Sequence, residues 1–271
     1  MSLPSPRAHD TVLVTGASAG IGTELARQLA RRGHDLTLVA RRRDRLDEIA
    51  EELRAAHGVE VDVHACDLAD EGARAALIAA LQSGGRHVAA VCNNAGYGTF
   101  GKFWELPREG ETNQVRLNCL ALVDLSHAFL GPMVERGEGA VLQVGSMAAF
   151  QPIPWNSTYA ATKAFVLSFT EGVNAELAGT GVSMTVLCPG PVDTEFSEVA
   201  GVADEHSSLP GFMTQDAEEV ARAGIDGMLG GKRVVFTGMP HRVMAQAARF
   251  TPRAGLLPVM NKIGSRTLSG R

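Results

Sequence analysis

A tyrosine and a lysine stand four residues apart, at positions 159 and 163, and Ser146 precedes the tyrosine by thirteen residues. If this segment is helical, residues four apart lie on one face, so the lysine ammonium sits beside the phenol. A free tyrosine has a pKa of about 10, and moving it toward 7 takes roughly 4 kcal/mol, much of which a fixed neighbouring cation can supply. We therefore expect Lys163 to lower the pKa of Tyr159, and Tyr159 to exchange a proton with a carbonyl or alcohol oxygen.

A glycine-rich turn, Thr15-Gly16-Ala17-Ser18-Ala19-Gly20-Ile21-Gly22, follows a β-branched run near the start of the chain. Between a strand and a helix, such glycines let the backbone approach a pyrophosphate, and the helix amides and dipole hold its negative charge. Glycine clusters also occur in ordinary strand-to-helix turns. The position of this turn, after the first predicted strand, is therefore stronger evidence for phosphate binding than its glycine pattern. Together with the tyrosine and lysine, it predicts hydride transfer between a carbonyl and a nicotinamide.

Arginines rather than an acidic residue follow the second predicted strand. In an NAD-binding fold, a carboxylate about 20 residues beyond the glycine turn accepts hydrogen bonds from the adenosine ribose. This chain has Ala40-Arg41-Arg42-Arg43 there. Each charge-assisted hydrogen bond from a guanidinium to a 2′-phosphate contributes about 1.5 to 3 kcal/mol, whereas a 2′-hydroxyl leaves the cation unpaired. The sequence thus predicts NADP(H), held by Arg41 and Arg42, while a solvated helix start is the alternative that suits Arg43.

Short β-branched runs alternate with longer segments of helical period. One of these segments, Asp44 to His57, places Leu46, Ile49, Ala50 and Leu53 on a single stripe. The repeated units predict a Rossmann-like, doubly wound α/β fold with a seven-stranded parallel sheet and ligands at the carboxyl ends of the strands. We expect one domain, residues 1–238 with a lid at 194–214, and an extension of it at 239–271. The predicted strands are 11–14, 35–39, 59–65, 88–92, 140–144, 183–187 and 233–237.

The composition excludes several classes of protein. The 271 residues, 45% hydrophobic and 20% charged, suit one large α/β domain. Residues Met1 to Asp10 contain two prolines and no apolar stretch, so they do not resemble a signal peptide. The longest charge-free stretch, Gly139 to Thr162, contains prolines and amides, so no transmembrane helix is expected. The four cysteines lack CxxC spacing and no HExxH occurs, which predicts reduced thiols and no metal site. The net charge of −5 gives no support for nucleic-acid binding, and we expect a cytoplasmic location.

Six motifs follow one another in order along the chain. They are the Thr15 to Gly22 turn, Asp67-Leu68, Asn93-Asn94-Ala95-Gly96, Asn118, Ser146 with Tyr159 and Lys163, and Pro189-Gly190-Pro191-Val192-Asp193-Thr194. Over nearly the whole chain they resemble the motifs of the short-chain dehydrogenase/reductase family, in its shorter single-domain branch. Residues 147–154 and the carboxyl-terminal extension resemble ketoacyl-reductase-like members more weakly. Ala19 departs from members that carry a basic residue before Gly20, so the NADP preference rests on the two arginines.

The resemblance implies a catalytic tetrad. Ser146 would hydrogen-bond the substrate oxygen and Tyr159 would pass it a proton. Lys163 would lower the tyrosine pKa and bind the nicotinamide ribose, while Asn118 would hold a water for proton relay. The chemistry agrees with these roles, because hydride reaching a carbonyl carbon builds negative charge on the oxygen, which needs donors and a proton source.

The resemblance also implies the cofactor contacts. Asp67 and Leu68 would flank the adenine, residues 94–96 would line the channel, and Val192 and Thr194 would contact the carboxamide end. The expected cofactor-binding residues, besides Tyr159 and Lys163, are Gly16, Ser18, Ala19, Gly20, Ile21, Gly22, Arg41, Arg42, Asp67, Leu68, Asn94, Ala95, Gly96, Pro189, Gly190, Val192 and Thr194.

The expected substrate pocket is mostly apolar. It predicts a hydrophobic ketone, aldehyde or 3-oxoacyl chain, although an apolar lining is normal for a small-molecule site. The alternatives are a regulator that senses NADPH without turnover and a docking module that uses the fold as a scaffold. The pocket residues are Tyr97, Ala148, Phe150, Gln151, Trp155 and Pro191, with Phe196, Val199, Phe212 and Met213 from the lid.

Charge separates along the chain. Residues 227–271 hold eight Lys or Arg and no Asp or Glu, whereas the remainder is acidic. Val243, Ala247 and Phe250 form one stripe of a predicted helix that Pro252 stops. We expect this tail to lie against the acidic body of its own or a neighbouring subunit of a homodimer or homotetramer. The sharper alternative is that it docks on an anionic membrane surface, as a peripheral membrane protein would, or on an acidic acyl-carrier protein.

Overall fold

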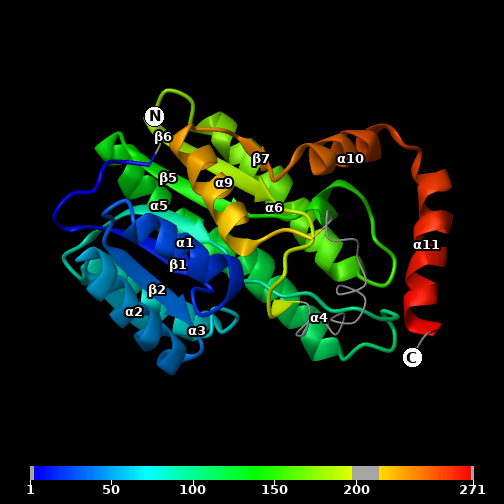
Figure 1. Ribbon diagram of the computed structural model, residues 1–271, viewed down its shortest axis with the longest axis horizontal. Helices are drawn as coiled ribbons and strands as arrows, with labels where there is room; N and C mark the ends of the chain where they lie inside the picture. Colours follow the sequence, from blue (N-terminus) through cyan, green and yellow to red (C-terminus); the bar gives the residue numbers. More distant parts are fainter. Residues whose placement is uncertain (1–2, 197–213, 270–271) are drawn as a thin grey trace.

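A single parallel sheet carries the site. The computed structural model describes residues 3–196 and 214–269. The strands of this part pair in the order β3-β2-β1-β4-β5-β6-β7, and every pair is parallel. The predicted seven-stranded Rossmann-like fold is therefore confirmed (Figure 1). The strands are β1 (Asp10–Thr15), β2 (Leu36–Ala40), β3 (Val61–Ala65), β4 (His87–Asn93), β5 (Gly139–Val144), β6 (Val182–Cys188) and β7 (Val234–Phe236).

Helices cover both faces of the sheet (Figure 1). On one face, α1 (Gly20–Ala30), α2 (Arg43–His57) and α9 (Ala217–Leu229) form a hydrophobic core with the strands. On the other face, α3 (Glu71–Ser83), α5 (Leu122–Arg136) and α6 (Ser157–Glu176) form a second core. Because helices bury both faces, strands need apolar residues throughout, and β1, β2, β5 and β6 are buried along their whole length.

The apolar stripe predicted between Asp44 and His57 forms the buried face of α2. Burying one such leucine or isoleucine side chain contributes roughly 1.5 to 3 kcal/mol, so the stripe is sufficient to hold the helix on the sheet. The helix ends at Gly58, whose φ of 66° is left-handed and favours glycine. Since α2 begins at residue 43, Arg41 and Arg42 lie in the short turn at the carboxyl edge of the sheet.

The strand order reverses beside β1. From β1 the chain builds β2 and β3 on one side, and it then crosses to β4 on the other side. Ligands of doubly wound sheets bind in the crevice that forms at such a switch point. The glycine turn follows β1 and the Asn94 to Gly96 segment follows β4, so both open toward this crevice.

A long helical run connects β4 to β5. It consists of α4 (Arg108–Val115), the π-helical turn η1 (Arg116–Ala121) and α5. Within the described residues this is the one helix that is long and apolar enough to cross a membrane, by length and composition only. Leu125, Phe129 and Met133 belong to the core on the sheet. The helical run therefore packs as a core helix, and core helices can meet the same criteria of length and composition.

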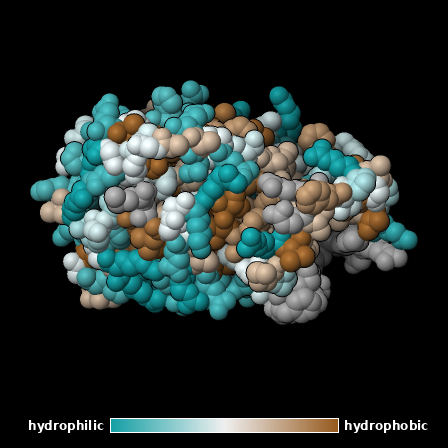
Figure 2. All heavy atoms as spheres, turned by 90° about the horizontal axis from the view of Figure 1, so that it is seen from above, coloured by the Kyte–Doolittle hydropathy of each residue, from teal (hydrophilic) through white to brown (hydrophobic). Residues whose placement is uncertain are grey.

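Two helices follow β7. α10 (Met239–Phe250) ends before Pro252 as predicted, and α11 (Arg253–Ser269) extends along the edge of the molecule (Figure 1). The predicted stripe faces outward, however: Val243 and Phe250 are 61% and 84% exposed, whereas His241 and Ala245 are buried. Apolar side chains thus gather on the surface near this end, while the opposite end is mostly hydrophilic (Figure 2).

Candidate active site

A cavity of about 680 Å³ opens at the carboxyl ends of the strands, across the switch point. Three predicted site residues, Gly22, Asn118 and Trp155, do not line it. Phe212, Val199 and Met213 lie outside the described residues. The predicted residues that line the cavity are Gly16, Ser18, Ala19, Gly20, Ile21, Arg41, Arg42, Asp67, Leu68, Asn94, Ala95, Gly96, Tyr97, Ser146, Ala148, Phe150, Gln151, Tyr159, Lys163, Pro189, Gly190, Pro191, Val192, Thr194 and Phe196.

The glycine turn has no room for side chains at its three glycines. Gly16 and Gly20 have φ values of 65° and 54°. A Cβ on Gly22 would lie 2.2 Å from the carbonyl oxygen of Gly16, so this glycine allows α1 to pack on the turn rather than lining the cavity. The backbone between Ser18 and Ile21 remains open at the start of α1, where amides and the helix dipole favour a phosphate.

Hydrogen bonds fix the glycine turn to the segment after β4. Asn94 Nδ2 donates to the carbonyl oxygens of Thr15 and Gly16 at 3.0 and 3.3 Å. The hydroxyl of Thr15 accepts from the backbone amides of Asn94 and Ala95, each at 3.0 Å. These hydrogen bonds therefore hold the two segments together at the switch-point crevice.

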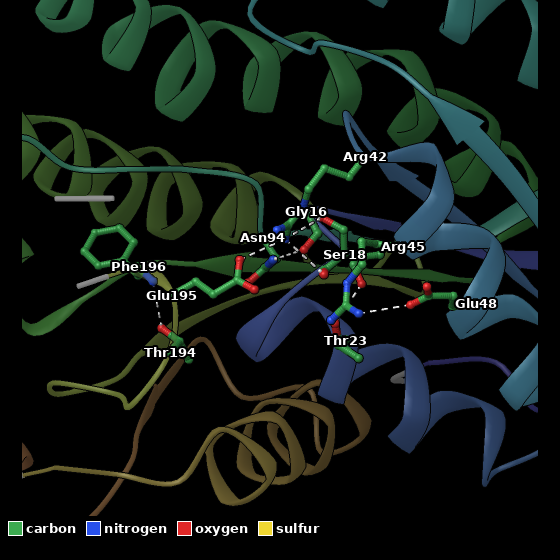
Figure 3. Close-up of polar contacts among 11 residues, drawn as sticks. Gly16, Ser18, Thr23, Arg42, Arg45, Glu48, Asn94, Thr194, Glu195 and Phe196 are labelled. Carbon is green, nitrogen blue, oxygen red and sulfur yellow. Dashed lines mark hydrogen bonds and ion pairs between the residues drawn. The ribbon is translucent and has the colours of Figure 1, made fainter. Parts of the chain in front are cut away.

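The arginines after β2 stand at the rim of the cavity. Arg41 is exposed, while Arg42 Nη2 donates to the Ser18 carbonyl oxygen at 3.1 Å and to Glu195 Oε2 at 2.9 Å (Figure 3). Arg43 pairs with Asp47 on α2 and lies off the cavity, as a solvated helix start would. The sequence argument treated the guanidinium of Arg42 as unpaired beside a 2′-hydroxyl; that was wrong, because Glu195 pairs with it.

Ser146, Tyr159 and Lys163 meet at the inner end of the cavity. Lys163 Nζ lies 5.7 Å from the centre of the Tyr159 ring and donates to the carbonyl oxygen of Val144 at 2.7 Å. Ser146 begins the short helix η2 (Met147–Phe150), where its Oγ accepts from the Ala148 amide at 3.1 Å. Ser146 lies near enough to Tyr159 to act on the pKa of its phenol. The end of β5 and the first turns of α6 thus place a hydroxyl, a phenol and an amine together.

Burial controls the ionisation of this group. Burial raises the pKa of Tyr159 to about 12, and the side chain of Ser146 opposes that rise. Burial also lowers the pKa of Lys163 to about 8. The expected lowering of the tyrosine pKa by Lys163 is therefore wrong for this structure, because desolvation of the phenol dominates and the amine is bonded to a backbone carbonyl. At pH 7 the phenol is protonated and most of Lys163 is cationic.

Asn118 supports the site from behind. Its side chain, only 2% exposed, lies in the π-helical turn. Its Oδ1 accepts from the Tyr97 amide at 3.2 Å, and its Nδ2 donates to the Tyr97 carbonyl and the Thr162 hydroxyl, each at 3.0 Å. Both side-chain donors are used within the protein, so a relay water at Asn118 could only donate, either to Oδ1 or to the backbone, which lies in a turn type that interrupts regular helical bonding.

Glu111 on α4 is a buried carboxylate that the sequence reasoning missed. It is 7% exposed, and the hydroxyls of Thr99 and Thr158 donate to its two oxygens. Because Thr158 directly precedes Tyr159, this carboxylate ties the start of α6 to α4. A lone glutamate in a polar stretch carries little signal. The one clue is its seven-residue spacing from Asn118, which places both on one side of a helix.

Aromatic side chains gather around Tyr159 and Phe150. The Phe196 and Tyr159 rings lie 5.4 Å apart between centres, and the Phe150 and Phe236 rings 5.5 Å apart. The phenol of Tyr97 donates to the carbonyl oxygen of Gly110 at 2.6 Å. Sequence reasoning missed a further group on α10, because no motif links that helix to the site. These residues are Met244, Ala245 and Ala248.

Trp155 faces α11 instead of the cavity. Its Nε1 donates to the carbonyl oxygen of Asn261 at 3.2 Å, and a Cβ on Gly264 would lie 2.0 Å from Cδ1 of the ring. Its predicted place on the substrate wall is thus wrong. The indole packs against α11 at Gly264, where any side chain would collide with the ring.

Comparisons with known proteins agree with this geometry. A family model described as short chain dehydrogenase matches residues 10–203. The chain is 36% identical to sulfoacetaldehyde reductase from Chromohalobacter salexigens over 217 residues, which are 78% of this chain and 85% of that protein. It is 29% identical to very-long-chain 3-oxoacyl-CoA reductase from Anas platyrhynchos over 256 residues, 92% of this chain and 78% of that protein.

A solved structure adds the cofactor. The short-chain dehydrogenase from Sphingobium yanoikuyae in complex with NADPH has a TM-score of 0.80 and 35% identity, and the match covers 92% of this chain and 95% of that one. The glycine turn, which has no side chain at Gly16 and Gly20, and the arginines at the rim fit this cofactor. The chain therefore belongs to the short-chain dehydrogenase/reductase family, as an NADP(H)-dependent oxidoreductase that acts on CH–OH and C=O groups.

Proposed function

We propose that this protein uses NADPH to reduce a hydrophobic ketone, aldehyde or 3-oxoacyl substrate to the alcohol, or catalyses the reverse reaction, with Tyr159 as the acid/base. One observation carries the proposal. The hydroxyl of Ser146, the phenol of Tyr159 and the amine of Lys163 line one cavity, which continues to the glycine turn.

The proposed roles follow from ionisation and geometry. The bound nicotinamide supplies the hydride. Ser146 donates a hydrogen bond to the carbonyl oxygen, on which negative charge develops, and Tyr159 gives that oxygen its proton. A pKa of about 12 keeps the phenol protonated until then. Lys163, cationic below its pKa of about 8, stabilises the phenolate that remains.

The lining of the cavity supports an apolar substrate. The names of the relatives do not indicate one substrate class for this chain. Sulfoacetaldehyde is small and charged, whereas a very-long-chain 3-oxoacyl group is long and apolar. Away from the glycine turn and the two arginines, the described lining has one cationic side chain, Lys163, and its polar residues are uncharged: Tyr97, Asn113, Ser146, Gln151 and Asn156. Its apolar lining residues include Ala148, Phe150, Ile153, Phe196, Met244 and Ala248.

The test is a panel of carbonyl pairs of similar size, one member apolar and the other carrying a sulfonate or carboxylate. Oxidation of NADPH, followed by loss of its fluorescence, should be at least tenfold faster with the apolar members at limiting concentration. Faster reduction of the charged members would reject the substrate class. Tight NADPH binding without oxidation by any pair would instead favour the sensor alternative.

We also propose a homodimer or homotetramer. α6 packs beside the π-helical turn η1. Leu120 on η1 and Phe165 on α6 are both exposed although large and apolar, which favours burial against a second copy of the chain. Light scattering should give at least twice the 28.6 kDa chain mass. Leu120→Glu with Phe165→Glu should lower it, whereas monomeric wild-type protein would reject the proposal.

A further inference from the structure

Arg42 and Glu195 form an ion pair across the mouth of the cavity. Arg42 comes from the turn after β2, and Glu195 follows Thr194 in the segment after β6. Their side chains meet at 2.9 Å, and both residues line the cavity (Figure 3). In the strand order, β2 and β6 lie on opposite sides of the switch point between β1 and β4. The ion pair therefore connects segments from the two sides of the crevice.

The pair lies directly on the glycine turn. Besides its bond to Glu195, the guanidinium of Arg42 donates to the Ser18 carbonyl at 3.1 Å and to the Ser18 hydroxyl at 3.3 Å. Next to it, a Cβ on Gly20 would lie 2.9 Å from the Thr194 side chain. The carboxylate of Glu195 thus stands beside the start of α1 and on an arginine, a setting that favours a phosphate.

We propose that Glu195 is a cofactor-specificity residue that acts against the 2′-phosphate. Its carboxylate uses guanidinium donors of Arg42 that the 2′-phosphate of NADPH would take. This inference rests on the proposed role of Arg42 at that phosphate. A cofactor with a 2′-hydroxyl leaves the Arg42–Glu195 pair intact, whereas a cofactor with a 2′-phosphate must replace it and also brings like charges together.

The expected effect is modest. The side chains of Arg42 and Glu195 are 45% and 47% exposed, and solvent screens such pairs, so they contribute little. Removing the competing carboxylate should therefore tighten binding of a 2′-phosphorylated ligand by about two- to fivefold. Binding of NADH should stay constant, so the preference for NADPH over NADH should rise by the same factor.

The experiment measures dissociation constants of Glu195→Gln by calorimetry, without turnover. The ligands are NADPH and NADH, together with 2′,5′-ADP and ADP, which differ by the phosphate but lack the nicotinamide. We expect both 2′-phosphorylated ligands to bind two- to fivefold tighter and the other two to be unchanged. Glu48→Gln is the matched control, because it removes the same charge from an exposed pair, with Arg45 at 3.0 Å, that does not line the cavity.

Each other outcome overturns the proposal in a defined way. Equal tightening of NADPH and NADH, or the same change in Glu48→Gln, would show a general charge effect. Weaker NADPH binding would show that Glu195 retains the cofactor instead of competing with its phosphate. In a double-mutant cycle the effect of Glu195→Gln should be smaller with Arg42→Gln, since only the repulsion between the carboxylate and the phosphate then remains. Arg42→Gln that leaves the NADPH to NADH ratio unchanged would reject the role of Arg42 itself.

Discussion

At the tyrosine end of the cavity the polar and charged groups are buried, whereas at the arginine end they are exposed to solvent. Burial raises the pKa of Tyr159 to about 12 and lowers that of Lys163 to about 8. At the other end, Arg42 and Glu195 remain nearly half exposed. One charged contact therefore carries more free energy at the first end, because water screens the second. The comparison predicts large effects of substitution near Tyr159 and small ones near Arg42.

The largest effect is expected for Tyr159→Phe. It keeps the ring but removes the transferable proton, so turnover should fall by about 10² to 10⁴ while the dissociation constant of NADPH stays within about twofold. Stopped-flow reduction and fluorescence titration measure the two. Tyr97→Phe, on the chain's other tyrosine, is the control; its phenol bonds the Gly110 carbonyl, so its loss should be much smaller. A fully active Tyr159→Phe would place the chemistry elsewhere.

The second effect is a pH dependence of stability from Lys163. Its folded pKa of about 8 lies below the unfolded value of about 10.4, so between these values the unfolded chain binds more protons and stability rises with pH. The free energy of unfolding of the wild type, minus that of Lys163→Met, should therefore rise by about 1 to 2 kcal/mol from pH 8 to 9.5. Urea unfolding measures it. A flat difference would mean that the amine is not desolvated.

The third prediction concerns the buried carboxylate of Glu111, which lies behind the site and not in it. Glu111→Gln weakens the bonds from Thr99 and Thr158, and losing one bond to a buried charge costs about 1.5 to 3 kcal/mol of stability. Turnover should fall as well, because Thr158 sets the start of α6, while NADPH binding should hold. Glu105→Gln, in an exposed pair with Lys102, is the control and should unfold like the wild type. Equal stability of the two variants would remove the structural role of Glu111.

The fourth prediction moves to the exposed end. Arg41→Asp should weaken NADPH binding by about tenfold and erase or reverse the preference over NADH, because a carboxylate repels the 2′-phosphate and accepts from a 2′-hydroxyl. Dissociation constants of both cofactors measure it. Arg43→Asp is the control, since Arg43 pairs with Asp47 away from the cavity. Equal affinity of the wild type for both cofactors would contradict the prediction, and a similar loss in Arg43→Asp would make it a general charge effect.

The last prediction concerns the basic extension, whose charges lie outside the cavity. Ending the chain at Gly238 is a poor test of membrane docking, because α10 lines the cavity. Reversing the exposed charges of Arg242, Arg253 and Lys262 to Glu keeps the helices. If the extension docks on anionic vesicles, sedimentation with them should fall by about tenfold or more, and added salt should weaken it in the wild type. Reversal of Arg43 and Arg45 on α2 is the control. If the wild type does not bind the vesicles, membrane docking is rejected, and the expectation that the extension lies against its own or a neighbouring subunit remains.

The sequence predicted most of the fold because regular elements depend on local pattern. The stripe of α2 needs only the 3.6-residue period, and the buried strands need only short apolar runs. The glycine turn and the tyrosine–lysine spacing are local as well, so they could be placed on the correct edge of the sheet. Trp155 was placed wrongly, since its partner Gly264 lies more than a hundred residues away.

Sequence alone therefore determined the parallel sheet, the edge where the site lies and the residue types that act there, since these follow from short-range periodicity and from strand ends meeting at one edge. Tertiary structure decided the electrostatics. It buried the phenol of Tyr159, so that its pKa rises, and it brought Glu195 to Arg42 across a separation of 153 residues. Desolvation and long-range pairing depend on what surrounds a group in space, and local spacing in the chain does not encode them.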